Sequence, residues 1–339
     1  MSILTFIPRI AASVLPVFFF LTALVFIDSY KLVRLRTILL SILVGCAVAA
    51  VCYFANSGLF EALNLEVKPF SRYVAPLVEE TLKAVFLVYL IRTSKVGFLV
   101  DAAIHGFAIG AGFAFIENIY YLQSVPEASL GTWIVRGFGT AIMHGGATAI
   151  FGMVSKSLYD RGAPGRLHLF LPGLGLAYAL HSLFNHFVLP PLLSTASLII
   201  VFPLVIVLVF HQSEQATREW LGVGFDTDQE LLKLITSREF ATTNVGRYLY
   251  ALKTRFPGEV IADMLCLLRL HVELSIRAKG ILMMREAGFQ VAPDPEVKAK
   301  FEELRYLEKS IGTTGLLAID PFLHTSSRDL WQLNMLDQK

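Results

Sequence analysis

Seven long apolar stretches occupy the first two thirds of the chain, and they restrict its possible folds more than any other feature. A helix of about 20 apolar residues crosses the hydrocarbon core of a bilayer. In lipid, every backbone polar group must also be paired within the protein, which a helix achieves alone. The stretches therefore predict an all-α, polytopic membrane helix bundle of about seven spans. They run over Ile10–Ile27, Thr37–Ala55, Tyr73–Ile91, Val96–Leu122, Trp133–Ser155, Leu167–Leu189 and Ser197–Phe210.

The residues after His211 have a different composition. Most charged residues of the chain lie there, and apolar residues such as Ile261, Leu265 and Leu268 recur at helical spacing. We expect two domains, a transmembrane bundle over residues 1–211 and a cytosolic helical domain over residues 212–339. The helices expected in the second domain are Gln229–Ile235, Ala241–Thr254, Pro257–Ala287 and Glu296–Ile311.

Basic residues in the loops predict the orientation of the bundle, because cytoplasmic loops of membrane proteins are enriched in Lys and Arg. Alternate loops hold most of them, and the intervening loops hold only Lys68 and Arg72 or none. We therefore expect the N-terminus outside and the C-terminal domain in the cytoplasm. The basic loops contain Lys31, Arg34 and Arg36, then Arg92 and Lys95, then Lys156, Arg161 and Arg166.

Composition narrows the possible partners. Hydrophobic residues make up 55% of the chain, so membrane lipid is an expected partner. The net charge is +2 and no basic stripe is present, so no nucleic-acid partner is expected. Cys46, Cys52 and Cys266 form no CxxC pair, so the sequence indicates neither a disulfide framework nor a cysteine metal site.

A few ionisable residues lie inside the apolar stretches, where charge is costly and commonly functional. With a rise of about 1.5 Å per residue, the antiparallel helices place them at similar depth in the outer half of the membrane. Scattered polar residues would have no reason to agree in depth, so we expect one buried site. Arg136 lies near the outer end of the fifth stretch, where it can reach the membrane surface. The residues of the site are Glu79, Glu80 and Lys83 in the third stretch, Glu117 in the fourth, His144 in the fifth, and His181, Asn185 and His186 in the sixth.

The residue types in this group are suited to metal-assisted hydrolysis. Catalytic zinc commonly takes three nitrogen and oxygen ligands, such as two histidines and a carboxylate, with water in the open position. Glu117, His144 and His181 supply that set, so we predict a zinc site there.

Further residues are candidates for proton transfer and oxyanion stabilisation. A carboxylate can accept the proton of the water and pass it to the leaving amine, and Glu79 or Glu80 is placed for that role. The sequence leaves open which of the two acts. Lys83 can neutralise part of their charge, and Asn185, one turn after His181, is a candidate donor to an oxyanion.

Each of these residues also has a structural interpretation. One glutamate of the adjacent pair can form a bridge with Lys83, and Glu117 can serve as an interhelical hydrogen-bonding group. His144 is followed by small residues and can be an incidental imidazole on a close-packed face. His186 points away from His181 on a helix and is interpreted as an interface histidine.

Four motifs on successive predicted helices suggest a family. In order, EETLK, FAFIEN, HGGAT and HSLFN resemble the EExxK, FxxxEN, HxxxG and HxxxD/N motifs of PrsW-like intramembrane proteases. These are related to the CAAX-processing and bacteriocin-immunity membrane proteases. The resemblance covers Ser71 to Leu189. It assigns Glu79 and Glu80 to the catalytic glutamate pair, Glu117 to the second motif, and His144 and His181 to the histidine motifs.

The resemblance implies cleavage of a membrane-tethered protein near the outer face of a bacterial inner membrane. An anti-sigma factor, whose cleavage releases a stress response, is one such substrate. Two differences from its relatives bear on the function. Asn185 stands where relatives often have Asp, and Glu117 stands where the prenyl-protein branch has His, so prenylated substrates are not implied.

Two other classes of function are compatible with intramembrane Glu and His residues. A proton or cation transporter would string charged groups across both halves of the membrane and would show inverted repeats. The grouping at one depth, without a detectable repeat, disfavours that class. A non-catalytic scaffold or chaperone would have no need for an intact set of motif residues.

Overall fold

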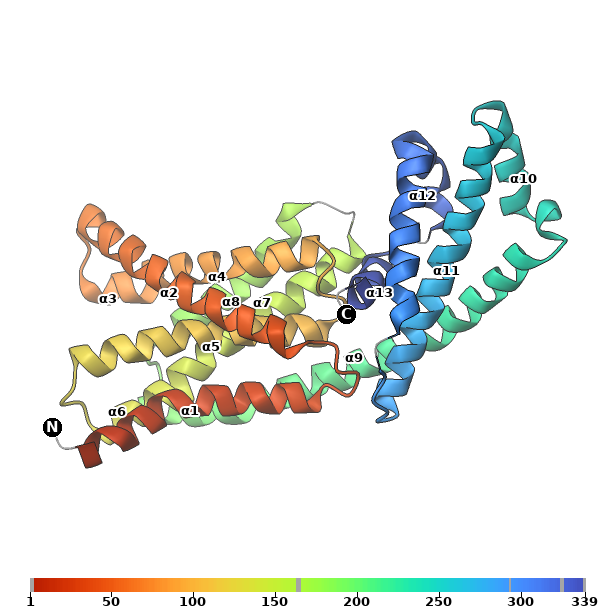
Figure 1. Ribbon diagram of the computed structural model, residues 1–339. Helices are drawn as coiled ribbons and strands as arrows, with labels where there is room; N and C mark the ends of the chain where they lie inside the picture. Colours follow the sequence, from red (N-terminus) through yellow and green to blue (C-terminus); the bar gives the residue numbers. More distant parts are fainter. Residues whose placement is uncertain (1–2, 163–165, 293, 324–325, 338–339) are drawn as a thin grey trace. The chain divides into compact units, whose positions relative to one another are not determined.

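Figure 1 shows a computed structural model of the chain, which describes residues 3–162, 166–292, 294–323 and 326–337. Within these residues every regular element is helical, as the apolar stretches predict. The chain divides into two compact units, Met1–Ser213 and Glu214–Lys339.

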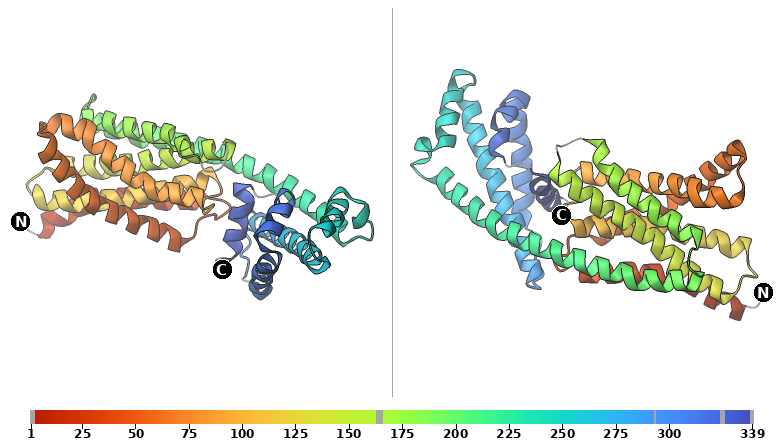
Figure 2. Two further views of the ribbon diagram at one scale, coloured as in Figure 1. Left: turned by 90° about the horizontal axis from the view of Figure 1, so that it is seen from above. Right: turned by 180° about the vertical axis from the view of Figure 1, so that it is seen from behind.

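The long helices of the first unit cover the seven apolar stretches and lie side by side as one bundle (Figures 1 and 2). Short helical segments, α3 (Val67–Pro69) and α6 (Leu130–Ile134), lie in two of the connections. The long helices are α1 (Ile3–Ile27), α2 (Leu35–Leu63), α4 (Ala75–Arg92), α5 (Leu99–Ser124), α7 (Ala141–Arg161), α8 (Leu171–His186) and the beginning of α9 (Pro191–Thr236).

Five helices among the described residues are long and apolar enough to cross a membrane. Helices α4 and α7 are not in this set. Helix α4 carries Glu79, Glu80 and Lys83, and α7 carries His144 and Lys156, so both are less apolar than their neighbours. The count of seven spans stays a prediction. The five apolar segments are Ile7–Ile27, Leu35–Leu63, Leu99–Ser124, Leu167–His186 and Pro191–Thr236.

Helix α5 is the centre of the first unit. It packs against α2 on one side and α7 on the other, and every residue from Val100 to Ala114 is buried. Two glycines allow the close approach: a Cβ on Gly110 would overlap the carbonyl oxygen of His144, and one on Gly112 would overlap that of Ile42. These are the helix contacts that small residues permit in membrane bundles.

Two π-helical turns precede the helices that carry the motifs. The turn η1 (Phe70–Val74) leads into α4, and the turn η2 (Val135–Thr140) leads into α7. Each extra residue in such a turn rotates the preceding side chains by about 100° relative to a regular α-helix. The two turns therefore determine which side chains of η1 and η2 lie on the same helix face as the motif residues of α4 and α7.

The second unit is built from the C-terminal part of α9 and from α10 (Asn244–Ala251), α11 (Gly258–Glu286), α12 (Pro295–Ile319) and α13 (Ser327–Asp337). Helix α11 packs against both α12 and α13. The last apolar stretch and the predicted helix Gln229–Ile235 form one continuous helix, α9, which runs through Gly222 and Gly224.

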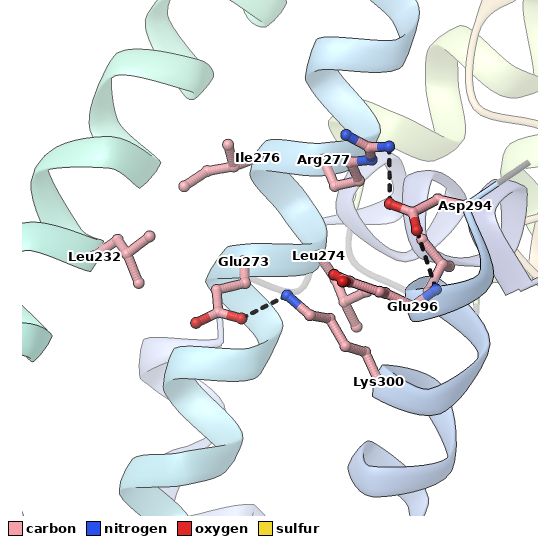
Figure 3. A pocket seen from close by; sticks show the side chains of 9 residues that line it. Leu232, Glu273, Leu274, Ile276, Arg277, Asp294, Glu296 and Lys300 are labelled. Atoms are coloured by element: carbon pink, nitrogen blue, oxygen red, sulfur yellow. Dashed lines mark hydrogen bonds and ion pairs between the residues drawn. The ribbon is translucent and has the colours of Figure 1, made fainter. Parts of the chain in front are cut away.

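Paired charges organise the second unit. Lys279 of α11 is buried, and its Nζ lies 2.6 Å from Asp228 Oδ2 of α9. A surface pocket of ≈ 280 Å³ is bordered by two further ion pairs, Glu273 with Lys300 and Arg277 with Asp294, each 2.8 Å long (Figure 3). Four of the five charged side chains that line this pocket are therefore paired with one another.

Candidate metal and active site

Glu80 and Lys83 form the buried base of the site. They lie one turn apart on α4, and the Lys83 Nζ donates to Glu80 Oε1 at 2.7 Å, with both side chains at most 1% exposed. The same Glu80 oxygen lies 2.8 Å from Nδ1 of His181 on α8. A carboxylate only accepts, so Nδ1 of His181 donates, and the Nε2 atom of the neutral ring keeps its lone pair. Glu80 therefore fixes both the orientation and the tautomer of His181.

His144 on α7 is held from both sides. The Lys83 Nζ lies 2.8 Å from its Nδ1, and Glu117 Oε2 of α5 lies 3.1 Å from its Nε2. The imidazole rings of His144 and His181 meet edge to face with centroids 4.7 Å apart. Lys83 thus joins the Glu80–His181 pair to His144. Its ammonium also lies 4.0 Å from the centroid of the Phe113 ring, which offsets part of the cost of burying this charge.

Glu79, the neighbour of Glu80 on α4, faces the second nitrogen of His181. Its Oε2 lies 3.9 Å from His181 Nε2, and its Oε1 accepts a hydrogen bond from Asn56 Nδ2 of α2 at 3.2 Å. Candidate ligand atoms of Glu79, His144 and His181 all lie within 4.8 Å of one another. Both glutamates of the pair therefore contact His181, although side chains that are adjacent on a helix point about 100° apart.

Glu117 has a second partner, Arg136 of η2. The Arg136 Nη2 lies 3.3 Å from Glu117 Oε2, and the Arg136 Nε donates to Asn118 Oδ1 at 2.9 Å. From the sequence we expected Arg136 to extend towards the membrane surface. The structure instead directs its guanidinium inward, because η2 turns this side chain towards α5.

Asn185 and His186 lie at the edge of the cluster. The Asn185 Nδ2 donates to the backbone oxygen of Ser71 in η1 at 2.9 Å, and His186 Nε2 lies 3.0 Å from the hydroxyl of Tyr73. One amide hydrogen of Asn185 therefore joins α8 to η1. The role of oxyanion donor would fall to the other.

A family model describing PrsW family intramembrane metalloproteases matches residues 33–210, which is more than half of the chain. The chain belongs to the PrsW family. It is therefore an integral membrane protein of an intramembrane protease family, as its motifs indicate. No curated protein and no solved structure matches the chain.

The donor atoms of this PrsW-family protein fit a metal ion. Two imidazoles and a carboxylate are a common zinc ligand set, and the Nδ1 atoms of both histidines are already bonded to Glu80 and Lys83. That leaves Nε2 of His181 with its lone pair, beside Glu79. The Lys83 ammonium donates to Nδ1 of His144, so Nε2 of His144 carries the proton that it donates to Glu117, and a metal ion would bind there in place of that proton. A carboxylate on the far nitrogen of a histidine is the usual support for a metal-binding imidazole, and Glu80 supplies it for His181.

The predicted convergence of the PrsW motifs agrees with these contacts. Glu80, Glu117, His144 and His181 come from four helices and are linked through Lys83 by hydrogen bonds. The sequence did not connect two further polar residues, Asn56 and Arg136, with the acidic groups that they contact. Asn56 follows the second apolar stretch, and Arg136 lies within the fifth. The polar character of Asn56 and Arg136, within or next to an apolar stretch, was the only feature of the sequence that could have pointed to these contacts.

Proposed function

We propose that this protein is a metal-dependent peptidase that hydrolyses a peptide bond of a membrane-tethered protein. The observation that carries the proposal is the approach of ligand atoms of His144, His181 and the partly buried Glu79 to within 4.8 Å of one another, with Glu80 behind His181. Zinc is the metal that this donor set fits best. Bound there, it would activate a water molecule and polarise the scissile carbonyl.

The residues around the histidines have separable roles in this proposal. Glu80 orients His181, and Lys83 holds Glu80 and His144 together while balancing negative charge in a site of low dielectric. Asn185 has an amide hydrogen left to donate to an oxyanion. The two remaining carboxylates, Glu79 and Glu117, each lie beside one Nε2 atom.

We assign different roles to Glu79 and Glu117. The mutual distances favour Glu79 as the third ligand, with His144 and His181. Glu117 is the more exposed of the two carboxylates, at 27% against 14% for Glu79, and we assign it the acceptance of the proton of the attacking water and its return to the leaving amine. The sequence alone favoured the opposite assignment, with Glu117 as ligand and a glutamate of the pair as base.

Zinc analysis of the purified protein tests the site. We expect one zinc per chain in the wild type, loss of zinc in His144→Ala, His181→Ala and Glu79→Gln, and retention in Glu117→Gln. Zinc retained in Glu79→Gln but lost in Glu117→Gln would instead support the assignment made from the sequence, with Glu117 as the ligand. Full zinc in both histidine variants would reject the site.

The substrate can be identified from the fragments that cleavage leaves in the membrane. Membranes of cells that produce the wild type are compared with those that produce Glu80→Ala or His181→Ala, by mass spectrometry of new protein N-termini. We expect fragments of a single-span protein, such as an anti-sigma factor, only with the wild type, cut near the outer membrane face. Identical fragments from all three chains would reject the peptidase.

We propose in addition that α4 and α7 complete a catalytic bundle of seven spans over residues 1–211. The protein would lie in a bacterial inner membrane with its N-terminus outside. Residues 212–339 would then form a helical domain in the cytoplasm. The distribution of Lys and Arg among the loops supports this orientation.

A further inference from the structure

Arg136 makes three contacts at the outer side of the site. Its Nη2 faces Glu117 Oε2 at 3.3 Å, its Nε donates to Asn118 Oδ1 at 2.9 Å, and its guanidinium carbon lies 3.7 Å from the centroid of the Tyr121 ring. The three partners belong to α5, whereas Arg136 belongs to η2. The guanidinium is therefore held against one helix by a salt bridge, a hydrogen bond and a stacking contact together.

Asn118 is itself fixed. Its Nδ2 donates to the backbone oxygen of Ser13 in α1 at 2.6 Å, and the residue is 1% exposed. Because Asn118 cannot turn without losing this bond, its Oδ1 provides a rigid acceptor for Arg136. The chain of contacts thus runs from α1 through Asn118 and Arg136 to Glu117, and ends at His144.

Arginine suits this position in a way that lysine does not. Its planar guanidinium presents several N–H groups in a fixed fork and stacks on aromatic rings, so it can serve Asn118, Glu117 and Tyr121 at once. A lysine ammonium keeps the charge but has neither the fork nor the flat face. The geometry therefore uses the shape of the arginine as well as its charge.

A role as an anchor at the membrane surface does not account for these contacts. A side chain that reaches for lipid headgroups extends its charged end towards water, whereas the Arg136 side chain is only 14% exposed and faces a carboxylate. Glu117 has two charged or titratable partners on neighbouring elements, Arg136 of η2 and His144 of α7. Arg136 is thus the permanently charged cation in contact with the proposed proton acceptor.

We propose that Arg136 is a positioning residue that acts through Glu117. This inference rests on the proposed function. Arg136 holds the Glu117 carboxylate beside His144 Nε2, at the place where the proton of the attacking water is accepted. The residue lies outside the four motifs and is brought to Glu117 by the π-helical turn.

The test uses the full chain, reconstituted in liposomes with the single-span protein whose fragments the N-terminal comparison identifies. Removal of an outer partner of a metal-site residue typically costs ten- to a hundredfold in activity. We expect Arg136→Gln to lower kcat by that factor, to leave KM within about twofold, and to keep one zinc per chain. Arg136→Lys should recover part of kcat, because it restores the charge but not the fork.

Arg72 provides the matched control. It is the corresponding arginine of the other π-helical turn, η1, and its Nη2 donates to the backbone oxygen of His186 at 3.4 Å. We expect Arg72→Gln to leave kcat unchanged. A fall equal to that of Arg136→Gln would show a general effect of removing a cation at this end of the bundle, and would overturn the proposal.

A double-mutant cycle identifies the residue through which Arg136 acts. In a Glu117→Gln background, Arg136→Gln should change kcat by less than about twofold, because the carboxylate that it positions is gone. If the two substitutions instead lower kcat independently, so that their fold-changes multiply in the double variant, the proposal is overturned. A wild-type kcat in Arg136→Gln would also overturn it. If Arg136→Gln does not fold, Arg136→Lys is measured alone. A kcat below that of the wild type supports the proposal, and a wild-type kcat overturns it. A wild type with neither zinc nor cleavage rejects the proposed function, whereas an active wild type with an unaffected Arg136→Gln rejects the inference alone.

Discussion

At the scale of single residues, the site is a chain of charge-assisted contacts between groups that would be costly to bury alone. Glu80 Oε1 accepts from both Lys83 and His181, and Lys83 in turn reaches His144. The sequence also allows a Glu–Lys83 bridge as a structural alternative to catalysis. The structure shows that the bridge exists and that the same glutamate also contacts a candidate ligand, so the two interpretations are compatible.

Glu80→Gln should weaken zinc binding by roughly ten- to a hundredfold, a typical cost for losing an outer partner of a metal ligand. The neutral amide would no longer balance Lys83 or fix the tautomer of His181. Competition with a chelator of known affinity measures the change. Glu61→Gln is the control, because Glu61 is an exposed glutamate near the end of α2. Equal zinc affinity in the wild type and Glu80→Gln would contradict the role assigned to Glu80.

At the scale of helices, backbone contact across α5 brings the motifs together. Gly110 lies opposite His144, and Gly145, the residue after His144, lies against the ring of Phe107 of α5. Any wider spacing of α5 and α7 would separate Glu117 from His144, which are 3.1 Å apart. The small residues are therefore part of the geometry of the site although they carry no chemistry.

Gly110→Ala should destabilise the bundle by about 1–3 kcal/mol, the usual cost of overpacking, and should lower cleavage. The added methyl group would overlap backbone atoms of α7, which cannot move aside as a side chain can. Thermal unfolding in detergent measures the effect. Gly175→Ala on α8 is the control, since a Cβ there meets nothing within 4 Å. Equal melting temperatures for the two variants would show that α5 and α7 have more space than their contacts indicate.

At the scale of the whole molecule, the chain combines an apolar unit with a charged one. The first unit exposes many large aliphatic side chains on α1, α2 and α9, which is expected where lipid is the solvent. The second unit instead buries a network of Lys279, Asp228 and Ser275 and carries ion pairs on its surface. These surfaces are suited to two different solvents.

Protease accessibility in oriented vesicles tests the proposed topology. Trypsin should degrade the second unit, which is rich in Lys and Arg, in inverted inner-membrane vesicles, and should leave it intact in right-side-out vesicles. The loops around Lys31 and Arg92 should be cut from the same side as the tail. Cleavage of the tail in right-side-out vesicles would contradict the orientation inferred from the loop charges.

The sequence alone determined the helical class, the approximate positions of the long helices other than the extent of α9, and most of the ionisable residues that meet. Apolar stretches of spanning length have few other stable forms in lipid, and the cost of intramembrane charge singles out Glu80, Glu117, His144 and His181. These features depend on local composition, so they can be read along the chain. The family match to residues 33–210 agrees with the motifs on these helices.

Only the tertiary structure decided which atoms face one another. The π-helical turns η1 and η2 rotate side chains by an amount that composition does not reveal, and η2 brings Arg136 to Glu117. The contact of Asn56 with Glu79 depends on how α2 lies against α4, and the attachment of both Glu79 and Glu80 to His181 depends on the approach of α8. Helical periodicity fixes the faces of one helix, whereas the partner of each face is set by packing among all of them.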